Sequence, residues 1–405
     1  MFTNAQYSAY SQAIRTKPLP LAFVDLDFFD ANIKHVQNTA QDTGKTIRVG
    51  TKSIRCEPLT RRIFELGGPT FQGLLTYTAV ETAWLAGKGY DDFIIAYPTV
   101  QKSDLDLIVQ MARAGKKVLP MVDNREHLKI LSEAAKNAGV ELPLCLEIDM
   151  SYRPIKSSNI HLGIRRSPLR TPEDALNFAR EAKQMPGISI KAIMGYEGHI
   201  ASAGDTVPGK FFKNAFLKAI KKRSINELNE RRQAIVKALH DEGVELEIVN
   251  GGGSGSLPSS LKDPSLTEVT VGSGFFSPAL FHHFAEIKYQ PSAFFAIQVV
   301  RFPAPGIITC LGGGYPASGP AGEDKLPLPV LPVGLQYLPL EGAGEVQTPL
   351  VMPRDCPQLN LGDPVIFQHA KGGELSERFS EYLLLQNHEV VGNALTYRGE
   401  GNIFL

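Results

Sequence analysis

Short apolar runs alternate with amphipathic stretches along the chain from residue 21 onward. The stretches between the runs have apolar residues at helical spacing, and one begins with Thr171 and Pro172, an N-cap followed by proline at the first helical position. Strands separated by helices indicate parallel βαβ units whose sheet is covered on both faces. The nine candidate strands span residues 21–27, 46–52, 71–78, 92–98, 118–123, 142–150, 189–199, 246–252 and 267–274.

A series of this length predicts a closed (β/α)8 barrel of the TIM type rather than a doubly wound open sheet. Because such a barrel holds eight strands, one of the nine candidates must lie elsewhere. We place the run at 21–27 outside the barrel.

The pattern changes near residue 285. Twelve of the 28 prolines fall between residues 302 and 364. Proline at this density excludes helices and favours short strands joined by turns. The sequence therefore predicts an N-terminal extension at 1–20, a barrel at 21–284 and a smaller β-domain at 285–405.

The charge balance excludes whole classes of partner. Lys+Arg and Asp+Glu are 42 each among 405 residues, so no net charge attracts the chain to nucleic acid or to anionic lipid. The four cysteines form no CxxC pair, and no apolar run approaches the ~18 residues that span a bilayer. We expect a cytoplasmic protein with neither a nucleic-acid nor a membrane partner.

The segment from Lys210 to Arg232 is rich in basic residues interleaved with Phe, Leu and Ile. This pattern predicts a long helix with a solvated basic outer face. An RNA-binding role is the alternative.

Candidate chemistry gathers at the predicted strand ends, where barrels build their active sites. Lys52 ends the second run, and Asp149 and Arg153 lie at the end of the sixth. Two glycine- and serine-rich strand ends at 250–256 and 272–274 are typical of an anion-binding nest, with plain tight turns as the alternative. The seventh run ends with Tyr196, Glu197 and His199. Together with the lysine, the arginine and the nest, these residues predict a pyridoxal phosphate site.

Several motifs make the sequence resemble the fold-type III pyridoxal phosphate enzymes, which include alanine racemase, D-threonine aldolase and D-serine dehydratase. The segment RVGTK at 48–52 resembles the cofactor-lysine motif R-P-H-x-K of that family, with Gly50 in place of the histidine. Residues 196–199 match the Y-x-G-H segment, and 149–153 resemble D-x-G-x-x-R with one residue fewer. The first run and helix (24–33) and the glycine-serine segments also match.

This resemblance implies a lyase that acts on an amino acid, in particular a D-3-hydroxy amino acid, by aldol cleavage or dehydration. Lys52 would form a Schiff base with pyridoxal phosphate, and Arg153, with Arg165 as reserve, would face the pyridine nitrogen. A homodimer is implied as well. The other implied cofactor-binding residues are Tyr196, His199, Gly252, Gly253, Ser254, Gly272, Ser273 and Gly274.

The chain departs from the family at the metal site. The aldolase and dehydratase branch binds a divalent metal through a His-x-Cys or His-x-Asp pair, whereas this sequence has His369, Ala370 and Lys371. Because Lys371 would repel a cation, we assign no metal ligands, although Glu374 could replace the lost one. We expect His369 to act as an acid–base group.

Two other functions stay open at this point. One is an amino-acid racemase, which needs a second base opposite Lys52. The other is a pyridoxal phosphate-binding homeostasis protein without turnover, which the predicted β-domain argues against because such proteins are usually a lone barrel.

Overall fold

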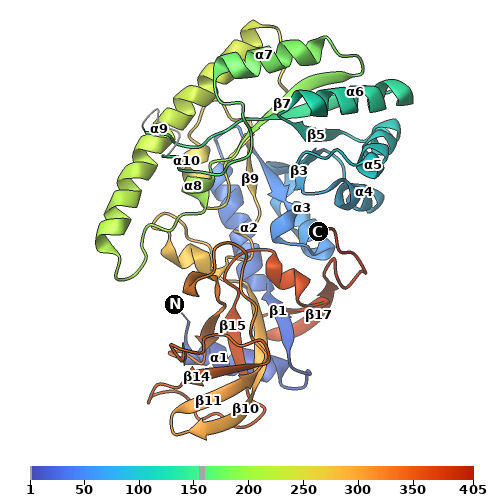
Figure 1. The fold of residues 1–405 in the computed structure, drawn as a ribbon. Helices are drawn as coiled ribbons and strands as arrows, with labels where there is room; N and C mark the ends of the chain where they lie inside the picture. Colours follow the sequence, from blue (N-terminus) through green and yellow to red (C-terminus); the bar gives the residue numbers. More distant parts are fainter. Residues whose placement is uncertain (1, 155–159) are drawn as a thin grey trace.

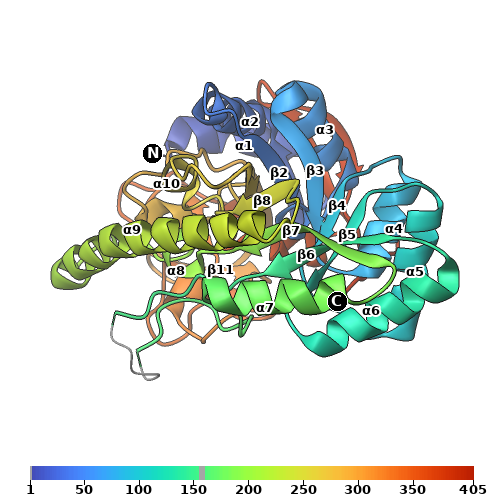
Figure 2. The ribbon, with the colours of Figure 1, turned by 90° about the horizontal axis from the view of Figure 1, so that it is seen from above.

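The computed structural model describes residues 2–154 and 160–405, and eight parallel strands within them close into a barrel (Figures 1 and 2). The last strand pairs with the first, which confirms the (β/α)8 prediction. The strands are β2 (Thr46–Gly50), β3 (Phe71–Thr76), β4 (Phe93–Ile95), β5 (Val118–Val122), β6 (Leu142–Glu147), β7 (Ile188–Gly195), β8 (Ile248–Gly251) and β9 (Glu268–Val271).

Helices cover the outside of the barrel (Figure 2). Their apolar faces pack on the strands, and side-chain caps begin several of them; Thr171, for example, accepts the amide of Asp174. The helices are α2 (Leu26–Ala40), α3 (Glu57–Gly67), α4 (Ala79–Gly87), α5 (Lys102–Arg113), α6 (Arg125–Ala138), α7 (Pro172–Lys183), α8 (Gly198–Ala201), α9 (Phe211–Asp241) and α10 (Leu257–Ser260).

A second, mostly antiparallel sheet lies below the barrel in Figure 1. The first apolar run forms β1 (Leu21–Asp25), which pairs with β10 and β16 from the last third of the chain and not with the barrel. The other strands are β10 (Ala293–Ala304), β11 (Ile307–Leu311), β12 (Leu328–Leu331), β13 (Gln336–Tyr337), β14 (Gln347–Val351), β15 (Pro364–Gln368), β16 (Glu381–Gln386) and β17 (Glu389–Leu395).

Residues 2–20 also belong to this part of the molecule. They form α1 (Asn4–Ile14), which buries Tyr10 against Phe23 and Phe294. The Tyr10 hydroxyl donates to Asp25 Oδ2 at 2.6 Å, and the other oxygen of Asp25 accepts the amide of Phe28 at the start of α2. One carboxylate therefore joins α1, β1 and α2.

Several strands end earlier than the sequence predicts. β1 stops at Asp25 because its side chain caps α2, and β2 stops at Gly50 because residues Thr51–Ser53 turn into the 3-10 helix η1. The strands β6 and β7 end at Glu147 and Gly195. The polar residues beyond these ends therefore lie on loops at the carboxyl ends of the strands, where the backbone no longer follows the strand direction.

The predicted basic helix is α9, with 31 residues, but its basic face is not wholly solvated. Arg232 is almost fully buried and pairs with Glu197 at 2.8 Å and with Asp263. Arg231 is largely buried and donates to the carbonyl of Ser151 at 3.0 Å. These two residues correct the prediction, because Glu197, Asp263 and Ser151, which compensate them, lie outside α9 and far away in the sequence. Within the described residues, every helix is too short or too polar to cross a bilayer.

Candidate active site

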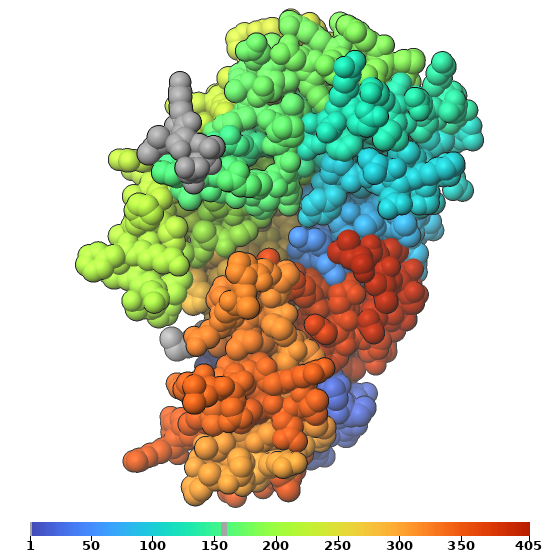
Figure 3. All heavy atoms as spheres, viewed as in Figure 1, coloured from blue at the N-terminus to red at the C-terminus, as the bar shows by residue number. Residues whose placement is uncertain are grey.

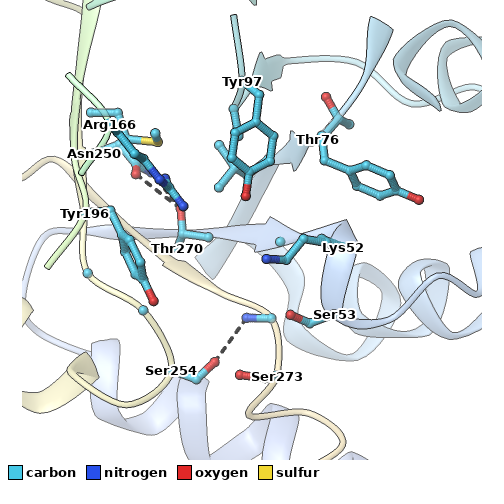
Figure 4. A pocket seen from close by; sticks show the side chains of 18 residues that line it. Lys52, Ser53, Thr76, Tyr97, Arg166, Tyr196, Asn250, Ser254, Thr270 and Ser273 are labelled. Carbon is cyan, nitrogen blue, oxygen red and sulfur yellow. Dashed lines mark hydrogen bonds between the residues drawn. The ribbon is translucent and has the colours of Figure 1, made fainter. Parts of the chain in front are cut away.

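A cavity opens at the carboxyl ends of the barrel strands (Figure 4). Two basic side chains, Lys52 and Arg166, face it, and among the described residues that line it none is acidic. A cavity with this charge suits an anionic ligand. The lining residues are Gly50, Lys52, Ser53, Leu75, Thr76, Tyr77, Ala96, Tyr97, Arg166, Met194, Tyr196, Asn250, Gly252, Gly253, Ser254, Thr270, Gly272 and Ser273.

Lys52 lies on η1, directly after β2, and its side chain is exposed. The turn is held from both sides: the hydroxyl of Thr51 donates to the carbonyl of Leu75 at 3.1 Å, and Arg55 Nε donates to the carbonyl of Lys52 at 2.9 Å. Figure 4 shows the amine of Lys52 pointing into the cavity. The backbone is thus fixed while the amine stays accessible, as a nucleophile requires.

A cradle of serine side chains and amides lies beside this lysine. The hydroxyl oxygen of Ser254 accepts the amides of Gly272 at 3.2 Å and Gly274 at 2.9 Å, which leaves its hydrogen available for an anion. Among the described residues, the amides of Ser254 and Ser273 have no protein acceptor. This arrangement fits a phosphate group.

The glycines of the cradle act differently from the prediction. The amide of Gly252 donates to Glu197 Oε2 at 2.5 Å and that of Gly253 to Ser256 Oγ at 3.1 Å, so both are already used. Gly272 is needed for space, because a Cβ there would lie 2.7 Å from the carbonyl oxygen of Gly50. Gly274 supports Ser254 from outside the cavity.

Arg166 lies on the side of the cavity opposite the serine cradle (Figure 4). Its guanidinium lies 5.2 Å from the ring centres of both Tyr97 and Tyr196 and 3.4 Å from Glu147 Oε1. The hydroxyl of Tyr196 bonds to that of Ser202 at 3.1 Å. Burial raises the pKa of Glu147 to about 7, although Arg166 opposes that shift. The arginine is thus oriented by two rings and a carboxylate.

Sequence reasoning missed Arg166 and named Arg153 and Arg165 instead. Arg153 does not line the cavity; its Nη2 lies 2.7 Å from Asp149 Oδ2. Arg165 is exposed, and its neighbour faces inward. Residues 163–171 are neither helix nor strand, so no periodicity could show which of the adjacent Arg165 and Arg166 faces the cavity.

His199 also lies outside the cavity. Its Nε2 contacts the hydroxyl of Ser224 on α9, and burial, together with the charge of Arg231, lowers its pKa to about 4. It therefore joins α8 to α9 as a neutral side chain.

His369 lies behind the cavity rather than in its lining. The ring is 5% exposed, packs edge-on against Phe276, and its Nδ1 lies 3.2 Å from the carbonyl oxygen of Ala293. Burial lowers its pKa to about 4. His369 is thus absent from the residues that line the cavity of Lys52, and its role as an acid–base group stays a prediction.

The loop after His369 nevertheless supports the site through its backbone. A Cβ at Gly373 would lie 2.1 Å from the carbonyl oxygen of Lys52, so only glycine fits against η1. Glu374, the alternative metal ligand, accepts the amide of Ser318 at 3.0 Å. Within the described residues, no three His, Cys, Asp or Glu side chains are grouped as metal ligands.

Comparison with known proteins agrees with this geometry. Residues 24–278 match the family described as alanine racemase, N-terminal domain. The chain belongs to this family. The matched part holds the barrel strands, Lys52 and the serine cradle, which confirms the resemblance seen in the sequence.

Relatives with assigned activities are aldolases. The 3-hydroxy-D-aspartate aldolase of Paracoccus denitrificans (strain Pd 1222) is 25% identical over 260 residues, 64% of this chain and 60% of that protein. The D-threonine aldolase of an Arthrobacter species is 22% identical over 289 residues, 71% of this chain and 69% of that protein. The chain thus covers less than two thirds of the Paracoccus enzyme.

Solved structures show that the fold extends over both domains. The D-threonine aldolase from Filomicrobium marinum superposes with a TM-score of 0.80 at 19% identity, covering 96% of each chain. The D-threo-3-hydroxyaspartate dehydratase from Delftia sp. HT23 gives 0.72 at 17% identity, covering 95% of this chain and 98% of that one. An alanine racemase of Clostridium difficile gives 0.62 at 13% identity over 93% of this chain.

Proposed function

We propose that this protein is a pyridoxal phosphate-dependent lyase that cleaves or dehydrates a D-3-hydroxy amino acid. The observation that carries the proposal is the cavity itself: an accessible lysine on a fixed turn faces a serine cradle, and in the part of the chain that the structure describes no carboxylate lines this cavity. The aldolase and dehydratase names of the relatives support the reaction class.

The residues fit the cofactor by their chemistry. The amine of Lys52 would hold its aldehyde carbon, and the Ser254 hydroxyl with the free amides of Ser254 and Ser273 would hold its phosphate. Arg166 is the arginine that faces the cavity and takes the position expected of Arg153. When bound, pyridoxal phosphate supplies an electron sink for bonds at the Cα atom of an amino acid.

Each remaining step belongs to a side chain of this protein. Lys52 Nζ, once free of the cofactor, can hold or move a proton at Cα. Arg166, a permanent cation, cannot give up a proton to a ring nitrogen, and the rings of Tyr97 and Tyr196 restrict its movement. Tyr196 and the cradle exclude water from one side of the cavity.

We also propose a homodimer, because the amine of Lys52 is exposed in the single chain and needs a cover that excludes water. The substrate panel described next also tests whether turnover requires a metal, because each substrate is offered with and without a chelator.

The test is a substrate panel on purified protein with its cofactor content measured. D-threonine, 3-hydroxy-D-aspartate, D-serine and L-alanine are offered with and without a chelator, and aldehyde, ammonia and chirality are assayed. Aldehyde or ammonia from a D-3-hydroxy amino acid is expected. Racemisation of L-alanine alone, or cofactor binding without turnover of any substrate, would contradict the proposal.

A further inference from the structure

A reaction at the 3-hydroxyl of a substrate needs a proton-transfer group in addition to Lys52, and the cavity limits which group this is. Among the described residues that line the cavity, the titratable side chains are Lys52, Arg166 and three tyrosines; none is a carboxyl, an imidazole or a thiol. Arg166 cannot give up a proton, and Lys52 serves as the base at Cα. A tyrosine hydroxyl is therefore the group left to act on the 3-hydroxyl.

Two of the three tyrosines are poorly placed to give a proton to a ligand. The hydroxyl of Tyr196 is bonded to that of Ser202 at 3.1 Å. Tyr77 is only 4% exposed, and Arg55 lies over its ring at 5.2 Å. Burial, together with the charge of Glu81, raises the pKa of Tyr77 well above its usual range, so that its hydroxyl holds its proton more firmly.

Tyr97 has neither restriction. It follows the end of β4, and its backbone is held in place because the amide of the preceding Ala96 donates to the carbonyl of Thr76 at 2.8 Å. In the part of the chain that the structure describes, its hydroxyl has no hydrogen-bond partner. Figure 4 shows this hydroxyl pointing into the cavity, in the direction of the amine of Lys52. The guanidinium of Arg166 lies 5.2 Å from the ring centre, so a permanent cation is next to the ring that becomes negative when the proton leaves.

A ligand can reach these groups from solvent. Lys52 is exposed although it directly follows a barrel strand, and Tyr97 is half-buried. The space-filling view shows a recess in the surface between the barrel, green to blue, and the β-domain, orange and red (Figure 3). The amine and the phenol hydroxyl are thus available to a small molecule in the same cavity.

On the basis of the proposed lyase function, we propose that Tyr97 is the general acid of a dehydration, in which the hydroxyl of a D-3-hydroxy amino acid leaves as water. Lys52 Nζ takes the proton from Cα, and the electron pair of that bond forms the Cα–Cβ double bond. The Cβ–O bond breaks, and the departing oxygen takes the proton of the Tyr97 hydroxyl. Lys52 then passes its proton to the phenolate oxygen, which restores both groups. The released enamine reacts with water to give a 2-oxo acid and ammonia.

Dehydration and aldol cleavage make opposite demands on this hydroxyl. Dehydration needs the proton of Tyr97, because hydroxide is a poor leaving group without it. Cleavage of the Cα–Cβ bond needs a base that removes the proton of the 3-hydroxyl, and a neutral phenol is a donor. A cavity whose free group is a phenol hydroxyl therefore favours dehydration.

The first test compares two leaving groups on the cofactor-loaded protein. Tyr97→Phe removes only the hydroxyl, so conversion of D-serine to ammonia should fall ~100-fold in kcat, with KM changed far less. Conversion of 3-chloro-D-alanine should stay within ~3-fold of the wild-type rate, because chloride leaves without a proton. A merely structural role of Tyr97 would lower both rates together. Tyr90→Phe is the matched control, since the hydroxyl of Tyr90 bonds to Glu57 at 3.0 Å outside the cavity, and both rates should be unchanged.

The second test is independent of turnover. Its probes are conjugates in which the amino group of D-serine or of D-alanine has been joined to pyridoxal phosphate and reduced with borohydride. Titrated into cofactor-free wild type and followed by fluorescence, the serine conjugate should bind about 5-fold more tightly, the scale of one neutral hydrogen bond. The preference should disappear in Tyr97→Phe and persist in Tyr196→Phe, because Tyr196 directs its hydroxyl to Ser202.

The outcomes separate this proposal from the lyase function on which it rests. Unchanged conversion of D-serine by Tyr97→Phe, an equal loss with both leaving groups, or equal affinities of wild type for the two conjugates would each overturn the role of Tyr97. Aldehyde from D-threonine without ammonia from D-serine would overturn dehydration while the lyase function stands. Absence of turnover with every substrate would contradict the lyase function itself, and the conjugate affinities would still decide whether Tyr97 meets the 3-hydroxyl.

Discussion

Arg48 and Lys52 are four residues apart on the same strand and turn, yet the barrel treats these two cations in opposite ways. Arg48 is fully buried, with Nε 2.6 Å from Glu268 and Nη2 3.2 Å from Asp92, both near the amino ends of their strands. Lys52 lies at the carboxyl ends, exposed to a cavity that no carboxylate lines.

The difference separates structure from chemistry. A buried cation must be paired, because an uncompensated charge inside a protein costs several kcal/mol. Arg48 meets this condition. Together with Glu268 and Asp92 it fills the barrel near the amino ends of the strands, which we call the floor. A cation that is held in place but left without a counter-charge is available to a ligand that brings its own negative charge.

The largest effect on turnover is expected at the carboxyl ends of the barrel strands, the mouth of the barrel, where Lys52 lies. Lys52→Ala should remove the covalently held cofactor and its visible absorption, and lower turnover by up to ~10⁴-fold, the upper range for a lost acid–base group. Borohydride reduction and peptide mapping should find the pyridoxyl group on Lys52 of the wild type. Lys102→Ala, on an exposed helix, is the control; an adduct on another lysine would refute the assignment.

Arg48→Met should affect the floor instead. It leaves Glu268 and Asp92 without their cation, so the free energy of unfolding is expected to fall by ~3–5 kcal/mol. Denaturant titration measures this loss. If cofactor affinity fell while stability did not, the distinction between floor and mouth would be wrong.

Arg166→Met tests the second cation of the cavity. Loss of hydrogen bonds from a charged group costs ~1.5–3 kcal/mol, so cofactor affinity should weaken by roughly 10–100-fold with little change in stability. Glu147→Gln should have a smaller effect in the same direction, because it only orients Arg166. Fluorescence titration of each cofactor-free protein measures the cofactor affinity. If wild type, Arg166→Met and Glu147→Gln bound the cofactor equally well, Arg166 would not belong to the cofactor site.

A smaller effect is expected from Ser273→Ala. The variant loses one hydroxyl of the cradle while keeping the amide, so cofactor affinity should fall by about 5–10-fold, the scale of one neutral hydrogen bond. Ser265→Ala, at a serine outside the cavity, provides the comparison. An unchanged affinity would mean that the hydroxyl of Ser273 does not bind the phosphate.

The smallest effect on turnover is expected from His369→Asn, less than ~3-fold, because the ring does not line the cavity. Its effect should appear in stability against pH. The folded-state pKa is about 4 and the ordinary value 6.5, so the unfolded chain binds the proton first and stability falls as pH drops from 6.5 to 4. The variant should lose up to ~3 kcal/mol of that dependence.

Glu147 gives a slope of opposite sign, which helps to assign the curve. Its pKa is raised from 4.5 to about 7, so the folded state binds the extra proton and stability falls as pH rises from 4.5 to 7.

A hundredfold loss of turnover in His369→Asn would return this histidine to the catalytic group that the sequence predicts.

Much of this protein was determined by local sequence. The alternation of apolar runs and amphipathic segments predicted parallel strands covered by helices, and the length of the series favoured a closed barrel over an open sheet. Lys52 was identified because it follows a strand directly, and the serine-glycine segments because small residues there leave room for an anion. These features depend on neighbours in the chain.

Tertiary structure decided which charges are paired and which side chains face the cavity. Arg232 resembles a surface residue until Glu197 and Asp263 from outside α9 pair with it, and Arg231 does so until the carbonyls of Asp149 and Ser151 accept its hydrogen bonds. Arg166 and Arg165 cannot be told apart by sequence pattern until two tyrosines that follow β4 and β7, Tyr97 and Tyr196, pack against Arg166. His369 follows a strand end as Lys52 does, but Phe276 and Ala293 surround it. The surroundings of a side chain come from residues far away in sequence, and no local pattern records them.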